Sequence, residues 1–524
     1  MVQRNRKTTA VYVWLVIMLL VQMIFLSGCL KTTKTDTTKD HDLVIGMTQD
    51  ISGFYPWMTL RDTSTLTVNK NLFNSLVEMD PVTYRFVPAL TEQWNNPDNV
   101  TWRFILRKNV TFHNGNRFTA DDVKFTIEYM KEIPYFNEEL ASISKVNILD
   151  EYTVDIKTVQ PYPMLLYKLG GLYILSQDYI NSMNQSIETW PIGTGAYQLV
   201  EYIPGDHVTL SRFDDYWKGL PEVTKVSFQL LNTSADLKTV LMSGDIDLAP
   251  IQVEDVDDIQ STPGLAIESI QTPGVIYLSF DFRTNDSYRY PDGENPTADV
   301  RVRTAMYQAI DIDTILEKYV NGSATTATQF LTYHTFGYNP NISRLPYDVD
   351  QARDLMRKTG YDAGFSIEMD LPDVPKWVNI SNEIARQLLA INITVQLNPQ
   401  PWDVYYAKLY EKNTSLYITG ITPYDAEGLL DLLLCTPTKN STVGIWNYGN
   451  YSNPEVDRLS ELVTYTMDTK LRLAYIQEVF SIANADVAWV PLFSSIAFYG
   501  IRDDIEWKPR PSLFIWVEEI SFTE

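Results

Sequence analysis

The segment that decides the fold reads Trp102-Arg-Phe-Ile-Leu-Arg-Lys-Asn-Val-Thr-Phe-His-Asn-Gly115, followed closely by Phe118-Thr-Ala-Asp-Asp-Val123. Apolar residues alternate with Arg103 and Arg107 at its start, which is the pattern of a half-exposed strand. Thr119 to Asp122 forms a capping box, in which the two side chains satisfy free backbone amides of a first helical turn. The segment therefore predicts a strand, a turn and a helix in succession.

The same alternation of strands and helices continues on both sides of this segment. Leu43 to Met47 reads as a buried strand and Ile393 to Leu397 as a second one. Three aspartates stand where helix N-caps are expected, at Asp299, Asp348 and Asp468. Strands interleaved with helices predict α/β lobes rather than a sandwich or a helical bundle.

Composition narrows the class of protein. At roughly 150 residues per domain, 524 residues suggest about three domains or lobes. A net charge of −24 argues against binding of nucleic acid, because phosphates would be repelled. We expect no cofactor, because Gly193-Thr194-Gly195 lacks the sequence context of a nucleotide-binding loop and is instead predicted to be a tight turn at the entry to a strand. We expect no metal, because the four histidines lack the spacing of metal ligands. No GxSxG elbow is present, and we expect no enzyme.

The N-terminus predicts export. A basic start is followed by an apolar run from Ala10 to Phe25 and then by Leu26-Ser-Gly-Cys29, which resembles the lipobox of secreted lipoproteins. We expect residues 1–29 to be a signal peptide whose Cys29 takes the lipid, and residues 30–42 to be a Thr-rich tether. The alternative is an uncleaved anchor, although the apolar run is short of the roughly 20 residues that span a membrane. Both interpretations place the remaining chain outside the membrane.

Two other features concern the surface and the core. Cys435 follows three leucines and is expected to be a buried thiol. Sequons for N-glycosylation are unusually dense, which suggests a glycosylated surface protein. They begin at Asn99, Asn109, Asn184, Asn232, Asn285, Asn321, Asn341, Asn379, Asn392, Asn413, Asn440 and Asn450.

Several blocks in order resemble the extracellular solute-binding proteins of family 5, the oligopeptide, dipeptide and nickel group of ABC-transporter binding proteins. The segment from Trp102 to Val123 is similar to the most distinctive signature of that family. The other blocks are Val87 to Trp94, Pro191 to Tyr197, Asp214 to Trp217, Leu241 to Asp247, Asp299 to Arg303, Ala309 to Asp311, and Tyr347 to Asp348.

The resemblance implies a two-lobed α/β fold of the periplasmic-binding-protein type II class, with an inserted subdomain in lobe one and a ligand enclosed between the lobes. Lobe one would comprise residues 43–80, 191–272 and 491–524, the subdomain residues 81–190, and lobe two residues 273–490. The chain would cross between lobes at Pro273-Gly274 and again near Val490-Pro491.

The ligand contacts of this family lie in loops between the lobes. At the matching position this chain has Gly420-Ile-Thr-Pro-Tyr-Asp-Ala-Glu-Gly428. Tyr424 replaces the aspartate that pairs with a peptide ammonium group in peptide-binding members, and Asp425 is displaced by one residue. Aromatic residues are dense in the neighbouring loops, where flat rings can stack on a ligand. The candidate ligand-binding residues are Trp57, Trp402, Tyr405, Tyr424, Asp425, Glu427, Trp446 and Tyr448.

The implied function is solute capture for an ABC importer at the outer face of the cytoplasmic membrane. The expected partners are a small solute, the permease with its ATPase subunits, and the membrane through the lipid, and the protein is expected to be a monomer. A peptide ranks first as ligand, an oligosaccharide second because of the aromatic residues and the lost aspartate, and a nickel chelate third. A ligand-sensing receptor module is the alternative, but it would need a signalling domain or a partner.

Overall fold

The computed structural model of the protein describes residues 41–54, 62–182, 190–284, 295–422, 426–438 and 442–523. Of these, the residues from Leu43 onward belong to one compact unit. The predicted signal peptide and nearly all of the predicted tether lie outside the described residues. Among the helices that are described, none is long and apolar enough to cross a membrane.

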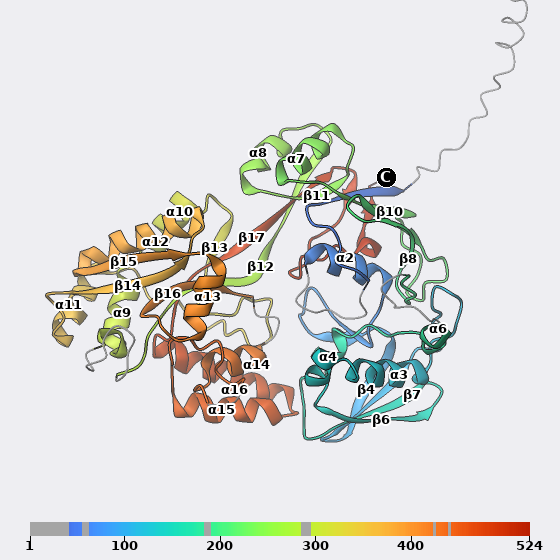
Figure 1. Ribbon diagram of the computed structural model, residues 1–524, viewed down its shortest axis with the longest axis horizontal. Coiled ribbons are helices and arrows are strands. Elements are labelled where there is room, and N and C mark those ends of the chain that lie inside the picture. Colours follow the sequence, from blue (N-terminus) through green and yellow to red (C-terminus); the bar gives the residue numbers. More distant parts are fainter. Residues whose placement is uncertain are drawn as a thin grey trace, which may run out of the picture. The chain divides into compact units, whose positions relative to one another are not determined.

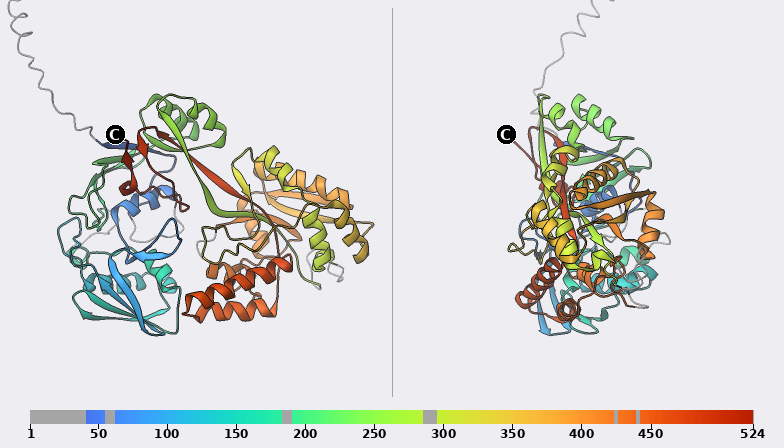
Figure 2. Two further views of the ribbon diagram at one scale, coloured as in Figure 1. Left: turned by 180° about the vertical axis from the view of Figure 1, so that it is seen from behind. Right: turned by 90° about the vertical axis from the view of Figure 1, so that its left-hand side faces the viewer.

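Two long strands join the two halves of the fold (Figures 1 and 2). They are β12 (Leu265–Phe280) and β17 (Val490–Arg502), which pair antiparallel from Leu265 opposite Arg502 to Leu278 opposite Val490. The register shifts between Gln271 and Val275, where Pro273 interrupts the ladder because proline has no amide hydrogen. The sheet order is β15-β14-β16-β12-β17-β11-β1-β10-β9-β8, with β13 paired to β17.

Lobe one lies on the β17 side of this sheet. Its strand β1 pairs in parallel with β11, and β8, β9 and β10 form an antiparallel meander. Its elements are β1 (Asp42–Met47), α2 (Thr63–Leu72), β8 (Tyr197–Ile203), β9 (His207–Arg212), β10 (Lys225–Leu230), α7 (Ser234–Ser243), β11 (Leu248–Ile251), α8 (Val256–Gln260), β18 (Ile505–Glu506) and β19 (Ser521–Phe522).

A separate four-stranded sheet, in the order β4-β5-β7-β6, has a core of its own. The predicted strand–turn–helix segment is confirmed here: Trp102 lies on β5, and Thr119 donates its amide hydrogen to Asp122 across 2.9 Å at the start of α3. The elements are β2 (Val77–Met79), β3 (Phe86–Pro88), β4 (Thr91–Asp98), β5 (Thr101–Leu106), α3 (Ala120–Lys131), α4 (Pro134–Glu139), β6 (Ile143–Asp150), β7 (Thr153–Thr158), α5 (Leu165–Gly170) and α6 (Gln177–Ser182).

Lobe two combines parallel strands β14, β15 and β16 with helices, and a helical group follows in sequence. Asp299, Asp348 and Asp468 each accept a backbone hydrogen bond as N-caps, as predicted. The elements are α9 (Val300–Gln308), α10 (Ile312–Tyr319), β13 (Ala324–Thr326), α11 (Val349–Thr359), β14 (Phe365–Pro372), α12 (Pro375–Leu388), β15 (Ile393–Gln400), α13 (Trp402–Tyr410), β16 (Leu416–Ile421), α14 (Ala426–Leu429), the π-helix η5 (Leu430–Leu434), α15 (Pro454–Tyr465) and α16 (Thr469–Ala485).

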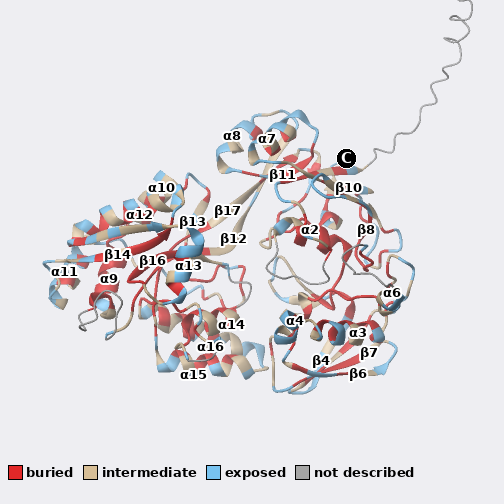
Figure 3. Ribbon diagram, viewed as in Figure 1, coloured by how far each residue is buried: buried red, intermediate tan, exposed pale blue. Residues whose placement is uncertain are grey.

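Buried residues concentrate on the sheets and on the inward faces of the helices (Figure 3). The apolar cores of lobe one and lobe two contain different residues, as expected for two lobes with separate cores. Cys435 is free and buried, and burial raises the pKa of its thiol to about 11, which confirms the predicted structural thiol. The two-lobed α/β class is confirmed, whereas the lobe boundaries stay predictions.

Gly193 and Gly195 are required by close packing and not by a left-handed turn. A Cβ atom at Gly193 would lie 2.0 Å from the carbonyl oxygen of Leu72, and one at Gly195 would lie 2.4 Å from that of Asn71. Neither glycine has a positive φ. The chain does bend directly before β8, as predicted, but the glycines are required by the close approach of this segment to the end of α2.

His113 holds the same segment in place. Its Nδ1 accepts the amide hydrogen of Gly193 across 3.3 Å, and its Nε2 lies 3.1 Å from the carbonyl oxygen of Gly195. One neutral tautomer, with the proton on Nε2, satisfies both contacts. Burial lowers the pKa of His113 to about 4, because the charged ring would be desolvated.

This arrangement predicts an acid-dependent loss of stability. The folded pKa of about 4 lies below the unfolded value near 6.5, so the contribution of His113 is complete above pH 6.5 and is lost as the pH falls toward 4. The free energy of unfolding of the wild type should therefore fall more steeply between pH 7 and 5 than that of His113→Gln. Urea unfolding at each pH measures both slopes, and equal slopes would contradict a neutral His113.

Candidate functional site

Helix α13 presents a row of aromatic rings at intervals of four residues, which places them on one helical face. Trp402 stacks on Tyr406 with ring centroids 5.6 Å apart and planes 19° apart, and Tyr406 is followed by Tyr410 at 6.4 Å. Trp402 is 44% exposed and Tyr410 is 50% exposed. We call Trp402, Tyr406 and Tyr410 the aromatic row.

A second tryptophan extends this surface from the neighbouring helix. Trp377, near the start of α12, meets Trp402 edge to face at 6.1 Å. Gly420 on β16 lies beneath it, since a Cβ atom there would lie 3.9 Å from the Trp377 ring and 2.7 Å from Ile276. The absence of a side chain at Gly420 thus leaves room for Ile276, whereas a Cβ atom there would be in ordinary van der Waals contact with Trp377.

Tyr405 and Tyr448 support the aromatic row from the core. Tyr405 is fully buried and donates its hydroxyl hydrogen to the carbonyl oxygen of Ile418 across 2.7 Å. Tyr448 is also buried, with ring contacts to Tyr410 at 5.5 Å and to Tyr417 at 5.9 Å. Both rings are packed in the core here. The expectation of a loop position is wrong for Trp402 and Tyr405, because both lie on α13, and Tyr405 faces inward.

An ionic cluster fixes α13 against the sheet. The Nζ atom of Lys408 lies 2.6 Å from Asp370 and 2.7 Å from Glu368, both on β14. Burial raises the pKa of Asp370, and the hydrogen bond from Lys408 opposes that shift without reversing it. Burial alone would lower the pKa of Lys408, but the two carboxylates outweigh it and raise that pKa. The cluster therefore sets the orientation of the aromatic row.

The segment after β16 carries the predicted polar residues. Tyr424 and Asp425 lie outside the described residues, and so does Trp57. Glu427, on α14, is 6% exposed, and its carboxylate lies 3.4 Å from the guanidinium of Arg472 on α16. That guanidinium also lies 5.1 Å from the ring centre of Phe336. Glu427 is thus an internal ion-pair partner in this conformation.

The structure brings together only some of the predicted ligand-binding residues. Trp402, Tyr405 and Tyr448 belong to one network of ring contacts through Tyr406 and Tyr410. Trp446 is half-buried and packs on the same core cluster as Tyr448. Sequence reasoning missed Trp377 and Tyr410 as site candidates. The four-residue spacing of positions 402, 406 and 410 could have identified Tyr410 from the sequence, whereas no sequence pattern points to Trp377.

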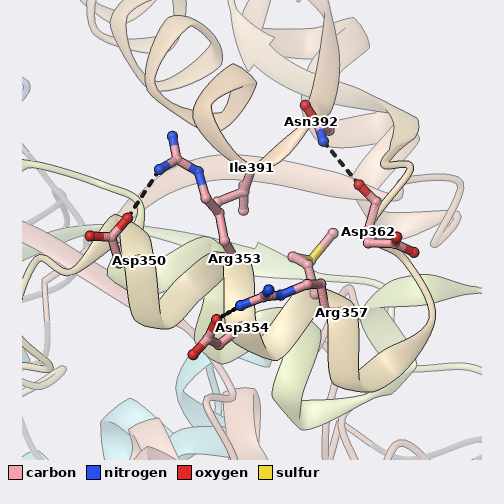
Figure 4. A pocket seen from close by; sticks show the side chains of 8 residues that line it. Asp350, Arg353, Asp354, Arg357, Asp362, Ile391 and Asn392 are labelled. Atoms are coloured by element: carbon pink, nitrogen blue, oxygen red, sulfur yellow. Dashed lines mark hydrogen bonds and ion pairs between the residues drawn. The ribbon is translucent and has the colours of Figure 1, made fainter.

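A surface pocket of about 420 Å³ lies elsewhere, beside α11 (Figure 4). Its guanidinium groups are compensated internally: Arg353 contacts Asp350 at 3.1 Å and donates to the carbonyl oxygen of Ala390, and Arg357 is paired with Asp354. None of the predicted ligand-binding residues lines this pocket. Because both of its guanidinium groups are already paired, we do not assign solute binding to it.

Comparison with known proteins decides the family. The model of bacterial extracellular solute-binding proteins, family 5, middle part, matches residues 85–441. The chain belongs to this family. The resemblance drawn from the sequence is therefore confirmed, and the protein is a solute-binding component of ABC import that acts in the periplasm or outside the cell, not an enzyme.

Individual relatives are distant but cover nearly the whole chain. The peptide transport periplasmic protein SapA of Salmonella typhimurium is 24% identical over 93% of this chain and 95% of its own length. The dipeptide-binding protein of Escherichia coli is 23% identical over 87% and 89%. Among solved structures, HbpA2 from Haemophilus parasuis has a TM-score of 0.82 at 22% identity, with 92% of this chain and all of that chain covered. These structures share the fold.

The position of Glu427 yields a test of its role. If Glu427 serves the fold, Glu427→Gln leaves Arg472 without its buried partner and should lower the free energy of unfolding by about 3 kcal/mol. Arg472→Met combined with Glu427→Gln should recover part of this loss, since the unpaired charge is removed. Chemical unfolding of the two variants measures both effects. A destabilisation below about 0.5 kcal/mol for Glu427→Gln would contradict the structural role.

Proposed function

We propose that this protein captures peptides outside the cell and delivers them to an ABC permease, with a lipid on Cys29 holding it at the membrane. The proposal of a peptide ligand rests on family membership together with relatives that are named as dipeptide- or di/tripeptide-binding proteins. One solved structure of similar fold, that of the periplasmic binding protein DppA from Helicobacter pylori, is in complex with the peptide STSA and has a TM-score of 0.68. The permease and its ATPase subunits are the implied partners.

The proposed site combines the exposed aromatic row with one acid after β16. Flat rings stack on apolar or aromatic side chains and cover them from water. A carboxylate that pairs with a terminal ammonium away from solvent contributes more than an exposed ion pair. Because Glu427 is already paired with Arg472, Asp425 is the acid we propose for the ammonium group.

An oligosaccharide is the second candidate, and the aromatic row is the observation that favours it. Trp402 is 44% exposed and Tyr406 is half-exposed, and accessible flat rings are of the kind that pack on sugar rings. Sugars carry no ammonium group, so the two candidates differ in how far binding depends on a carboxylate.

Ligand binding should separate the two candidates. For a free-amine peptide, Asp425→Asn should weaken binding by roughly 2–5 kcal/mol, because an ammonium would be left unpaired. For a sugar the same change should cost about 1.5–3 kcal/mol, and Trp402→Ala should cost a comparable amount. Trp402→Phe, which keeps a ring, is the matched control and should retain most of the affinity.

Calorimetry with a peptide pool and with an oligosaccharide pool provides the measurement, after native mass spectrometry has identified any co-purifying ligand. If neither Asp425→Asn nor Trp402→Ala weakens binding of that ligand, the proposed site is wrong.

Lipid attachment is tested separately. In the wild type the mature N-terminus should be Cys29 with an added acyl mass, and the protein should fractionate with membranes. Cys29→Ala should lose both features, whereas Cys435→Ala, which removes the buried thiol, should lose neither. Membrane retention of Cys29→Ala without processing would instead establish the uncleaved anchor.

A further inference from the structure

The asparagines of the sequons differ in burial from the other asparagines of the chain. Nine of the twelve sequon asparagines lie in the described part of the chain, and each of them is exposed or half-exposed. The buried asparagines, in contrast, all lie outside sequons. They are Asn69, Asn71, Asn74, Asn295, Asn339 and Asn447.

Six of these nine asparagines offer a side-chain amide that forms no hydrogen bond with the described residues and is exposed. They are Asn99, Asn109, Asn232, Asn321, Asn341 and Asn379. The other three are engaged. Asn392 donates to the carbonyl oxygen of Asp362 across 2.9 Å, Asn413 donates to Glu411 across 3.0 Å, and the amide nitrogen of Asn450 is shielded from solvent.

The six sequons differ in how far their Ser or Thr, two residues after the asparagine, is buried. Three sequons have a buried hydroxyl residue, namely Thr101, Ser323 and Ser381. In the remaining three, Thr111 and Ser234 are half-buried and Ser343 is exposed. The asparagines of these three sequons, Asn109, Asn232 and Asn341, are exposed and lie outside the helices and strands, where bulky polar groups are commonly tolerated.

We propose that Asn109, Asn232 and Asn341 are N-glycosylation sites that are modified on the folded chain after export. The glycan donor is an oligosaccharide attached to a lipid through phosphate, and a membrane-bound oligosaccharyltransferase catalyses the transfer. The asparagine Nδ2 forms a bond to the anomeric carbon of the first sugar and loses one proton. The bond between that carbon and the phosphate oxygen breaks, and the lipid phosphate leaves with its electrons.

Such modification is compatible with the proposed ligand site. None of the three asparagines belongs to the aromatic row or to the segment after β16. Asn109 follows β5 in the four-stranded sheet unit, Asn232 precedes α7 in lobe one, and Asn341 lies between β13 and α11 in lobe two. The proposal requires export of the chain but does not depend on which solute it binds.

The test is a glycopeptide map of the full chain, purified from membranes of the organism that encodes it. Peptides that contain Asn109, Asn232 or Asn341 should carry added hexose or N-acetylhexosamine masses. Peptides that contain Asn450 should have their unmodified mass. Recovery of all three predicted peptides solely in unmodified form would overturn the proposal.

Matched variants show whether the sequon itself directs the transfer. Ser343→Ala keeps Asn341 but removes its sequon, so the glycan on Asn341 should disappear while those on Asn109 and Asn232 remain. Asn137→Gln changes an exposed asparagine outside any sequon and should leave the map unchanged. Equal occupancy at Asn99, Asn321 and Asn379 would show that buried hydroxyls are no barrier, and it would overturn transfer to the folded chain.

Discussion

The pairing of β12 with β17 is the constraint on which the rest of the structure depends. On one side β17 pairs with β11, which aligns β1 and the meander of lobe one, and on the other β12 pairs with β16, which aligns the sheet of lobe two. The ladder is interrupted between Gln271 and Val275, where Pro273 cannot donate a hydrogen bond. The two lobes therefore share one sheet but meet at a stretch with fewer backbone hydrogen bonds. Beside this stretch, Ser494 donates its hydroxyl hydrogen to the carbonyl oxygen of Thr272 across 2.7 Å.

The sequence was most informative where one short segment determines the structure. The N-caps at Asp299, Asp348 and Asp468 could be predicted because each cap and the amide it binds lie within three residues of each other. The strand–turn–helix segment around Thr119 was predictable for the same reason. The fold class followed from the order of such local patterns together with the family blocks.

Features that depend on distant partners could not be predicted in this way. Glu427 looked like a free acid of a binding loop, but it is paired with Arg472, which lies 45 residues later in the chain. Tyr405 was indistinguishable from Tyr406 by composition, and only the helical period of α13 separates the buried ring from the half-exposed one. Gly193 and Gly195 resembled a turn, and only the position of α2 shows that close packing requires them.

The exposed rings of α13 are held before any ligand arrives. Lys408 fixes the helix to β14 through two carboxylates, and Tyr405 fixes it to β16 through a hydroxyl hydrogen bond. Trp402 is further confined between Trp377 and Tyr406. Rings that are already ordered lose little conformational entropy on binding, so more of the stacking energy is retained as affinity. Stacking alone recognises any flat or apolar face, and the choice among peptides, sugars and other solutes must therefore come from polar groups outside the aromatic row.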